Sequence, residues 1–335
     1  MKSLFIFTLY LFFISLIAST MIYGNHTIII QNASWAGWSI YNSNQPNSYT
    51  INSINGSWIV EKVLPSNELG WGMQWIGIGG LGNSDLLQIG TVSNWDCELV
   101  LSKPMCYPKY RAFWETTNNA IITSEQPISI SVHPEDKIYA SINSISSTHC
   151  LLGAPCWELY LKDLNGSQIS TYYVTYTPNR TSANWEEESI GPLSGSTYPF
   201  PLSKFWAADF GPKYTDMPNT NYANVNITTN KPVGWYSNLV ETYISRNFAG
   251  TAHPSNVTIS SDNSSFIVYE GPQLEMVGGL NVSRSMLDLG QEAAINGPHA
   301  EGGSGNYTYQ WIGSCVAGAW GFYYLSMYNM LYFNT

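Results

Sequence analysis

The sequence predicts an all-β fold, either a sandwich or a barrel, and three observations support this prediction. Apolar and polar residues alternate along most of the periodic segments, as they do on a strand with one buried face. Turn signals rich in Gly, Pro, Asn and Asp separate these segments at short intervals. No stretch of ten or more residues after the N-terminal apolar run has the spacing of an amphipathic helix. Many short strands joined by turns are typical of two packed sheets or of one closed sheet.

The clearest strands lie in the middle of the chain. Four segments there read as strands: 128–132, 138–142, 157–161 and 169–176. A Pro-Glu-Asp turn separates the first two, and Asn165-Gly166, the strongest short hairpin signal, lies between the last two. We therefore expect Ile128, Ile130 and Val132 to share one buried face.

The composition limits the classes of partner. The chain has 335 residues, of which 44% are hydrophobic and only 11% charged, with 13 Lys+Arg and a net charge of −10. Such a chain can bury a large core, whereas binding to nucleic acid needs clustered basic residues that are absent here. Few carboxylates depend on their charge for stability, so the composition is compatible with work in acid.

The N-terminus has the pattern of a secretory signal. Lys2 precedes an apolar run over residues 4–18, and small and polar residues follow. We expect a signal peptide over residues 1–24 and a secreted protein, although an uncleaved signal would attach it to the cell surface. Ten sequons fit a glycosylated exported protein: Asn25, Asn32, Asn55, Asn165, Asn179, Asn226, Asn256, Asn263, Asn281 and Asn306.

Export also favours disulfide bonds between the cysteines. The simplest pairing joins Cys97 to Cys106 and Cys150 to Cys156, which leaves Cys315 without a partner. His149 is beside one of these pairs, but a metal site would need further ligands nearby, so we predict no bound metal.

The character of the chain changes near residue 271. We expect one large β domain over residues 25–271 and a second unit over residues 272–335. The second unit resembles the opening half of Ig-like or PKD-like modules, with room for about three strands. Its uncharged, aromatic tail after Cys315 is a weak candidate for a membrane anchor.

Familiar catalytic motifs are missing, but a series of short segments resembles one enzyme family. There is no phosphate-binding glycine loop, zinc-binding His-Glu-x-x-His or nucleophile elbow. The segments that resemble the glutamic peptidases (eqolisins) occur in order: Asn32 to Gly37, Gly56 to Val60, Trp75 to Gly80, Leu86 to Thr91, Tyr110 to Glu115, Ala183 to Glu188 and Ala208 to Gly211. Each match is weak alone, and their order and spacing make the resemblance specific.

The resemblance implies a fold, an activity and a set of site residues. It implies a concanavalin A-like, lectin-type antiparallel β-sandwich that hydrolyses polypeptides without a cofactor. Gln88 and Glu188 match the family's catalytic glutamine and glutamate, and Trp75, Phe113 and Glu115 match positions in its substrate cleft. A glutamate can take a proton from water, while a glutamine amide stabilises the oxyanion and orients the water. We expect an acid-active monomer with no N-terminal prosegment.

Two departures from the family pattern bear on the site. Gly79 replaces the aspartate of the family's Trp-Val-Gly-Ile-Asp-Gly segment, which leaves the substrate preference open. Glu186 and Glu187 replace the Ile-Val before the catalytic glutamate, and we expect like-charge repulsion from them to raise the pKa of Glu188. Strand alternation would place Glu186 on the same face as Glu188.

Three other functions fit parts of the sequence. A lectin-like, non-catalytic protein that binds carbohydrate would use exposed aromatic residues, but it would not need Gln88 and Glu188 together. A surface-layer or adhesion protein would fit the sequons and the C-terminal unit. A glycosidase would use a pair of carboxylates, for which Glu115 and Glu188 are the candidates.

Overall fold

The computed structural model describes residues 28–270 with short gaps, and beyond them six short strands. The gaps within 28–270 are residues 33, 42–49, 67–68, 101–102, 119–120, 123–124, 147, 152, 190–200, 227–229 and 247–249. The predicted signal peptide therefore lies outside the described residues, as does Cys315.

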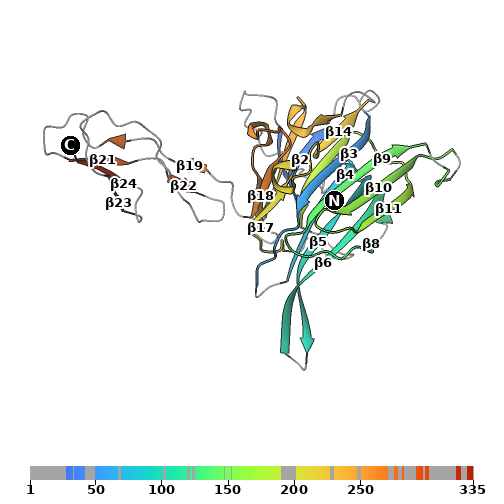
Figure 1. Cartoon of the computed structure of the whole chain (residues 1–335), viewed down its shortest axis with the longest axis horizontal. Helices are drawn as coiled ribbons and strands as arrows, with labels where there is room; N and C mark the ends of the chain where they lie inside the picture. Colours follow the sequence, from blue (N-terminus) through green and yellow to red (C-terminus); the bar gives the residue numbers. More distant parts are fainter. Residues whose placement is uncertain are drawn as a thin grey trace, which may run out of the picture.

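Eighteen strands are joined by hydrogen bonds into one continuous ladder, which folds into two packed layers (Figure 1). One layer, the front sheet, has the order β1 (Ile28–Asn32), β16 (Leu239–Arg246), β2 (Trp35–Tyr41), β12 (Ser182–Glu188), β4 (Gly70–Gly79), β5 (Leu86–Val100) and β6 (Lys103–Asn118), with β7 (Ile121–Ile122) and β8 (Gln126–Ile128) both paired to β6. Its neighbours are antiparallel except β1 and β16, which are parallel.

The other layer, the back sheet, is antiparallel throughout. Its order is β15 (Lys231–Pro232), β14 (Tyr222–Val225), β3 (Ile51–Ile59), β9 (Lys137–Ile145), β10 (Cys156–Asp163) and β11 (Ile169–Thr175). Three further strands join the two layers along one side, from β16 to β3: β17 (Gly250–Pro254), β18 (Phe266–Glu270) and β13 (Ala207–Phe210). The predicted all-β sandwich is confirmed.

Four fully buried tryptophans dominate the core between the layers. Each indole N–H donates a hydrogen bond: Trp38 to the Ser255 carbonyl at 2.9 Å, Trp58 to Thr91 Oγ1 at 2.9 Å, Trp157 to the Tyr176 carbonyl at 2.9 Å and Trp185 to the Asn55 carbonyl at 2.8 Å. Burying large aromatic rings is strongly favourable, and a satisfied N–H removes the penalty of burying a polar group. The core thus fixes β2, β3, β10 and β12, the last of which carries Glu188.

The predicted local features are confirmed with two differences in detail. Ile128, Ile130 and Val132 are all buried, but the hydrogen-bonded strand β8 ends at Ile128. Strands β10 and β11 form the predicted hairpin, but its connection is longer than two residues, since the register ends at Lys162 and Ile169. Within the connection, the backbone N–H of Asn165 donates to Asp163 Oδ1 at 2.8 Å. In the described residues the helices are single turns: α1 (Pro212–Thr215), η1 (Val233–Trp235) and η2 (Val257–Ile259).

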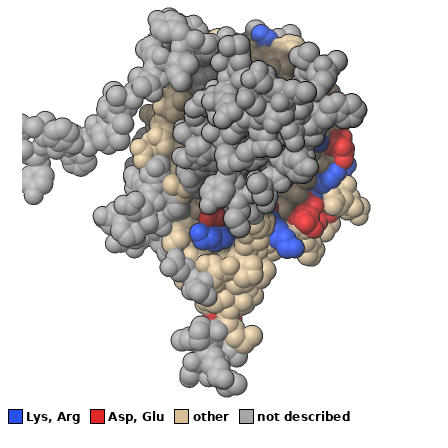
Figure 2. Space-filling model, turned by 90° about the vertical axis from the view of Figure 1, so that its left-hand side faces the viewer, with Lys and Arg blue, Asp and Glu red and all other residues tan. Residues whose placement is uncertain are grey.

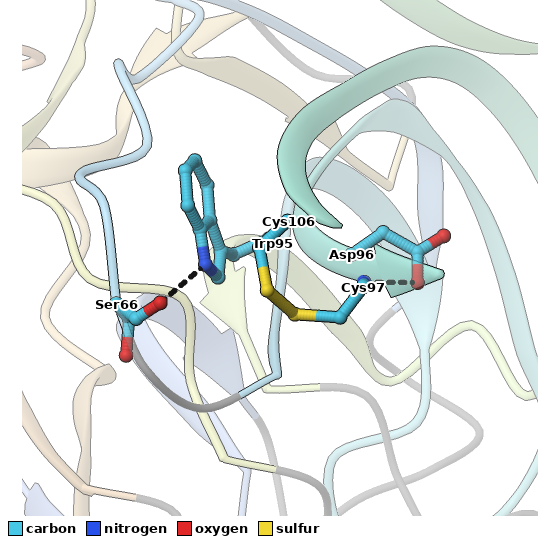
Figure 3. The surroundings of a disulfide bond; sticks show 5 residues. All are labelled: Ser66, Trp95, Asp96, Cys97 and Cys106. Atoms are coloured by element: carbon cyan, nitrogen blue, oxygen red, sulfur yellow. Dashed lines mark hydrogen bonds between the residues drawn. A yellow bond between two sulfur atoms is a disulfide. The ribbon is translucent and has the colours of Figure 1, made fainter. Parts of the chain in front are cut away.

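Both predicted disulfides are confirmed. Cys97–Cys106 joins directly paired residues of β5 and β6, in the hairpin that extends from the body in Figure 1. Figure 3 shows this bond beside Trp95, whose indole N–H donates to the Ser66 carbonyl at 2.7 Å. Cys150–Cys156 closes the loop that precedes β10. Neither bond crosses between the layers.

The described strands after residue 270 pair only with one another. They form a two-stranded sheet, β19 (Glu275–Val277) with β22 (His299–Glu301), and a four-stranded sheet in the order β20 (Asn281–Val282), β21 (Glu292–Asn296), β24 (Met330–Asn334) and β23 (Phe322–Leu325). Among the described residues, no helix has both the length and the apolar character needed to cross a membrane.

Candidate active site

The predicted catalytic residues come from neighbouring strands of the front sheet. Glu188 on β12 pairs with Met73 on β4, while Gln88 on β5 pairs with Gly77 on β4 and with Glu115 on β6. Met73 and Gly77 are four residues apart, so Gln88 and Glu188 project from the same side of the sheet. This is the outer face, which turns away from the main core and holds a second apolar cluster that includes Trp75 and Phe113.

Gln88 is held by Glu115 and keeps part of its amide free. Its Nε2 donates a hydrogen bond to Glu115 Oε2 at 2.9 Å, and the side chain is only 3% exposed. Its Oε1 is buried and accepts no hydrogen bond from the described residues. An amide nitrogen carries two hydrogens, so one N–H and the buried carbonyl oxygen keep hydrogen-bonding capacity that Glu115 does not use.

Glu188 carries a carboxyl group whose pKa is raised to about 8. Burial is the main cause, the negative charge of Glu115 adds to it, and the side chains of Trp35 and Trp75 lower the value in part. Its surroundings exclude most water, yet the residue keeps some accessible surface, unlike its fully buried neighbours Glu186 and Glu187. The expected rise in pKa is present. The charge of Glu115 contributes to it, and repulsion between Glu188 and the adjacent Glu186 and Glu187 appears as raised pKa values of those two residues.

Glu115 has a pKa raised to about 7. Burial is the largest cause and the charge of Glu125 adds to it, while the hydrogen bond from Gln88 lowers the value. Glu115 therefore holds the amide of Gln88 and also acts on the charge of Glu188, which links all three predicted polar residues.

Glu186 lies on the same face as Glu188, as alternation predicted, but it is fully buried. Its Oε1 accepts from Ser39 Oγ at 2.8 Å and its Oε2 from Thr242 Oγ1 at 2.6 Å. Burial raises its pKa to about 8 despite these bonds. A run of three glutamates commonly lies in a solvated loop, whereas here it is a strand paired on both sides, by β2 and β4.

Trp75 and Phe113 are fully buried beside the polar residues. The Trp75 ring packs edge-on against Trp35, with 4.9 Å between ring centroids. There is no room for a side chain at Gly77, since a Cβ there would lie 2.8 Å from the Trp75 ring. Trp75 and Phe113 form part of the apolar cluster beside Gln88 and Glu188 on the outer face. Their contact with substrate stays a prediction.

Trp35 was missed as a site residue by the sequence reasoning. Its side chain hydrogen-bonds to the Glu188 carboxyl and lowers its pKa. The signal was present in the segment from Asn32 to Gly37, which served only to support the resemblance to the family. Its role depends on the pairing of β2 with β12, which places Trp35 opposite Glu188.

Gly79, the departure from the family's aspartate, has a structural reason. Its φ is +85°, and a Cβ at this position would lie 2.1 Å from the Asp85 carbonyl oxygen and 2.8 Å from that of Asn179. The backbone turns sharply here at the end of β4 and approaches two other segments closely, so only glycine fits.

The arrangement suits acid–base chemistry by carboxyl groups. Within the described part of the chain, no three His, Cys, Asp or Glu side chains are grouped so that they could hold a metal ion. The outer face carries a partly accessible carboxyl group and, two strands away on the same side, an amide held by a second carboxyl group, with one donor and one acceptor of the amide unused. These are the groups needed to move a proton and to stabilise an oxyanion.

Comparisons with known proteins agree with this description. The model of the Peptidase A4 family matches residues 33–243. Among solved structures, scytalido-glutamic peptidase with a transition state analog inhibitor is 16% identical, with a TM-score of 0.49, and the match covers 71% of this chain and 98% of that one. SCP-B, a member of the Eqolisin family in a complex with the tripeptide Ala-Ile-His, is also 16% identical over the same shares, with a TM-score of 0.47. No curated protein matches the chain. Because the family model spans well over half of its residues, the chain belongs to the Peptidase A4 family, the glutamic peptidases.

Proposed function

We propose that this glutamic peptidase is a secreted, acid-active endopeptidase in which Glu188 carries protons and Gln88 stabilises the oxyanion. The observation that carries the proposal is the hydrogen bond from Gln88 to Glu115. It leaves one N–H and the Oε1 of the amide free on the face from which Glu188 projects. Those free groups match what a water molecule and a peptide carbonyl would require.

The pKa of Glu188 changes the expected form of the mechanism. The resemblance to the family implies that Glu188 is a general base, which as a carboxylate would have to be ionised. Burial raises its pKa to about 8, so in acid the resting group is protonated. A protonated carboxyl group has one oxygen that can accept a proton and one that can donate.

In the first step, Gln88 Oε1 orients a water molecule whose oxygen attacks the peptide carbonyl carbon. The water's proton moves to the unprotonated oxygen of Glu188, and the proton already on Glu188 moves to the carbonyl oxygen. The free N–H of Gln88 donates to that oxygen as charge develops on it. The product is a neutral gem-diol, and Glu188 is again protonated.

In the second step, the C–N bond breaks. Glu188 gives its proton to the departing nitrogen and takes one from a hydroxyl of the gem-diol, which leaves a carboxylic acid and an amine. No bond forms between the substrate and the protein in either step. Because its pKa is raised to about 8, Glu188 stays protonated in acid and can donate this proton to the nitrogen as the C–N bond breaks.

The substrate fits the outer face as an extended polypeptide. Polypeptide substrates follow from the family, and an extended chain would be held mainly through its backbone, so we propose broad side-chain specificity. We also propose the concanavalin A-like form of the sandwich, a monomer, and an Ig-like or PKD-like C-terminal unit.

Secretion is supported by the signal pattern over residues 1–24. The sequon at Asn165 lies exposed at the tip of the β10–β11 hairpin, which makes it a candidate for glycosylation.

Hydrolysis of casein from pH 2 to 7 with pepstatin present tests the catalytic assignment. We expect Glu188→Gln to lower kcat by at least about 10³-fold and Gln88→Ala by about 10²- to 10³-fold, because one removes the proton carrier and the other an oxyanion donor. Glu158→Gln, on β10 of the back sheet, is the control and should keep wild-type activity. Folded Glu188→Gln protein with wild-type activity would refute the assignment.

A further inference from the structure

A second pair of carboxyl groups lies on the opposite side of β12 from Glu188. Glu187 points into the space between the two sheets, where it meets Glu61, which follows β3. The two side chains are 0% and 2% exposed. A Cβ built on Gly72 would lie 3.1 Å from Oε1 of Glu187 and 3.2 Å from Oε1 of Glu61, so the two oxygens converge above the same glycine.

The pair is buried without the partners that ionised carboxylates need. None of its four carboxyl oxygens accepts a hydrogen bond of good geometry from a described residue, although the backbone N–H groups of Glu61 and Met73 lie close enough to lower the pKa of Glu61 and of Glu187 in part. The nearby Gln74 Nε2 is also buried without a partner. The Ser93 hydroxyl lies close enough to lower the pKa of Glu61 in part, but outside hydrogen-bonding geometry. A buried ionised carboxylate is costly unless it is paired or well hydrogen-bonded.

The groups around the pair offer no compensating positive charge. Glu61 faces Gln74 on β4, Ser93 on β5, Tyr110 on β6 and Glu187 on β12. Glu187 faces Glu61 and is repelled by Glu188 on its own strand. Among the described residues, no lysine or arginine contributes to the pKa of either group.

Burial raises the pKa of Glu61 to about 7, and burial together with the charge of Glu61 raises that of Glu187 well above its ordinary value. Two carboxyl groups in this position cannot both ionise while they remain buried. The folded protein therefore binds protons at this site that the unfolded chain, with ordinary glutamate pKa values near 4.5, releases.

We propose that Glu61 and Glu187 form a pH-operated latch: the two carboxyl groups can stay buried between the sheets while both are protonated, and their ionisation as the pH rises destabilises the packing of the sheets. The sign follows from the linkage between protonation and folding. The contribution is fully present below pH of about 4.5 and is lost progressively as the pH rises to about 7, where Glu61 is half ionised in the folded state. The enzyme is thus stable where we propose that it works, and it loses its fold in neutral surroundings.

The latch is a property of this chain. The family pattern that Glu187 matches has valine at this position, and an apolar side chain there would have no charge to bury. The proposal does not depend on the catalytic roles of Gln88 and Glu188, because its readout is unfolding and not hydrolysis.

The test follows unfolding from pH 4 to 9 by circular dichroism and tryptophan fluorescence. It compares the wild-type full chain with Glu61→Gln, Glu187→Gln and Glu187→Val. We expect the wild type to unfold as the pH passes through about 7, and each variant to move the midpoint up by about one pH unit, with the double Gln variant moving it further. Glu158 is a partly exposed glutamate on β10, and its replacement Glu158→Gln is the matched control, which should leave the midpoint unchanged.

Two results would overturn the latch. One is a wild-type midpoint that the Glu61 and Glu187 variants do not move. The other is failure of both Glu187→Gln and Glu187→Val to fold at pH 4, since the proposal requires that an uncharged side chain be tolerated there.

Discussion

At the scale of single residues, the site is determined by what each side chain does with its polar atoms. Gln88 gives one N–H to Glu115 and keeps its other groups free, while Glu186 is fully satisfied by Ser39 and Thr242 and has none to offer. The same residue type thus has different roles in β12. Glu188 remains partly accessible, Glu186 is sealed by hydroxyl groups, and Glu187 is buried against Glu61.

Gly79 provides a test of how tightly the end of β4 is packed. Gly79 and Gly153 both have positive φ, +85° and +81°. A Cβ added to Gly79 would lie 2.1 Å from the Asp85 carbonyl oxygen, whereas a Cβ added to Gly153 would have no atom within 4 Å. Gly153→Ala should therefore cost about 1–2 kcal/mol from the backbone conformation alone. Gly79→Ala should cost at least about 2 kcal/mol more, because the backbone carbonyls around it must move.

The measurement is the free energy of unfolding in urea at pH 4 for both variants. Equal losses of stability would show that the close approach of Asp85 and Asn179 to Gly79 is not a constraint on the fold.

At the scale of strands, β12 is the element on which the account depends. It lies between β2 and β4, presents Glu186 and Glu188 on one face, and sends Trp185 and Glu187 into the interior. The order of segments in the sequence could predict that this strand carries the catalytic glutamate. It could not predict that the strand is buried on both sides, because three consecutive glutamates have the local pattern of a solvated loop.

The β5–β6 hairpin is the other element that carries site residues. Gln88 and Glu115 are paired near its base, and Cys97–Cys106 joins the two strands farther out, beyond Trp95. Closing so short a loop limits the unfolded chain and is worth at most about 3 kcal/mol. The disulfide therefore stabilises the outer part of the hairpin more than the site.

Replacing both Cys97 and Cys106 by serine should increase hydrogen exchange in the outer hairpin. We expect protection at Gln88 and Glu115 to remain and activity to stay within about twofold of wild type, because the core holds the base of the hairpin. Cys150→Ser with Cys156→Ser is the comparison, and it should leave the exchange of β5 and β6 unchanged. Loss of protection at Gln88 would mean that the disulfide supports the site itself.

At the scale of the whole molecule, charged residues are few, and several of the carboxyl groups are buried. Most of the visible described surface in Figure 2 carries neither acidic nor basic side chains. Glu61, Glu115, Glu186, Glu187 and Glu188 all have raised pKa values, with burial as the main cause in each. A protein with this distribution takes up protons on folding, so acid favours the folded state.

The sequence predicted the features that depend on local pattern, but not the contacts that depend on the order of the strands. Strand alternation, turn signals and cysteine spacing predicted the sandwich, the β10–β11 hairpin and both disulfides, since these features depend on local pattern. Contacts between distant segments, such as Trp35 with Glu188 or Glu61 with Glu187, depend on strand order. Alternation gives the face of a residue but not its neighbour across the sheet.

In the proposed mechanism a protonated Glu188 moves protons between water and the peptide, and the pH dependence of kcat/KM reports on this proton transfer. It is measured from pH 2 to 8, within the range where circular dichroism shows folded protein, for the Glu61→Gln/Glu187→Gln double variant, whose fold should persist to higher pH, with and without Glu115→Gln. The account predicts a rate that is constant in acid and falls as the pH approaches 8. Glu115→Gln should move this fall to lower pH, because the charge that raises the pKa of Glu188 is removed. A rate that increases with pH through this range, as an ionised base would require, would contradict the account.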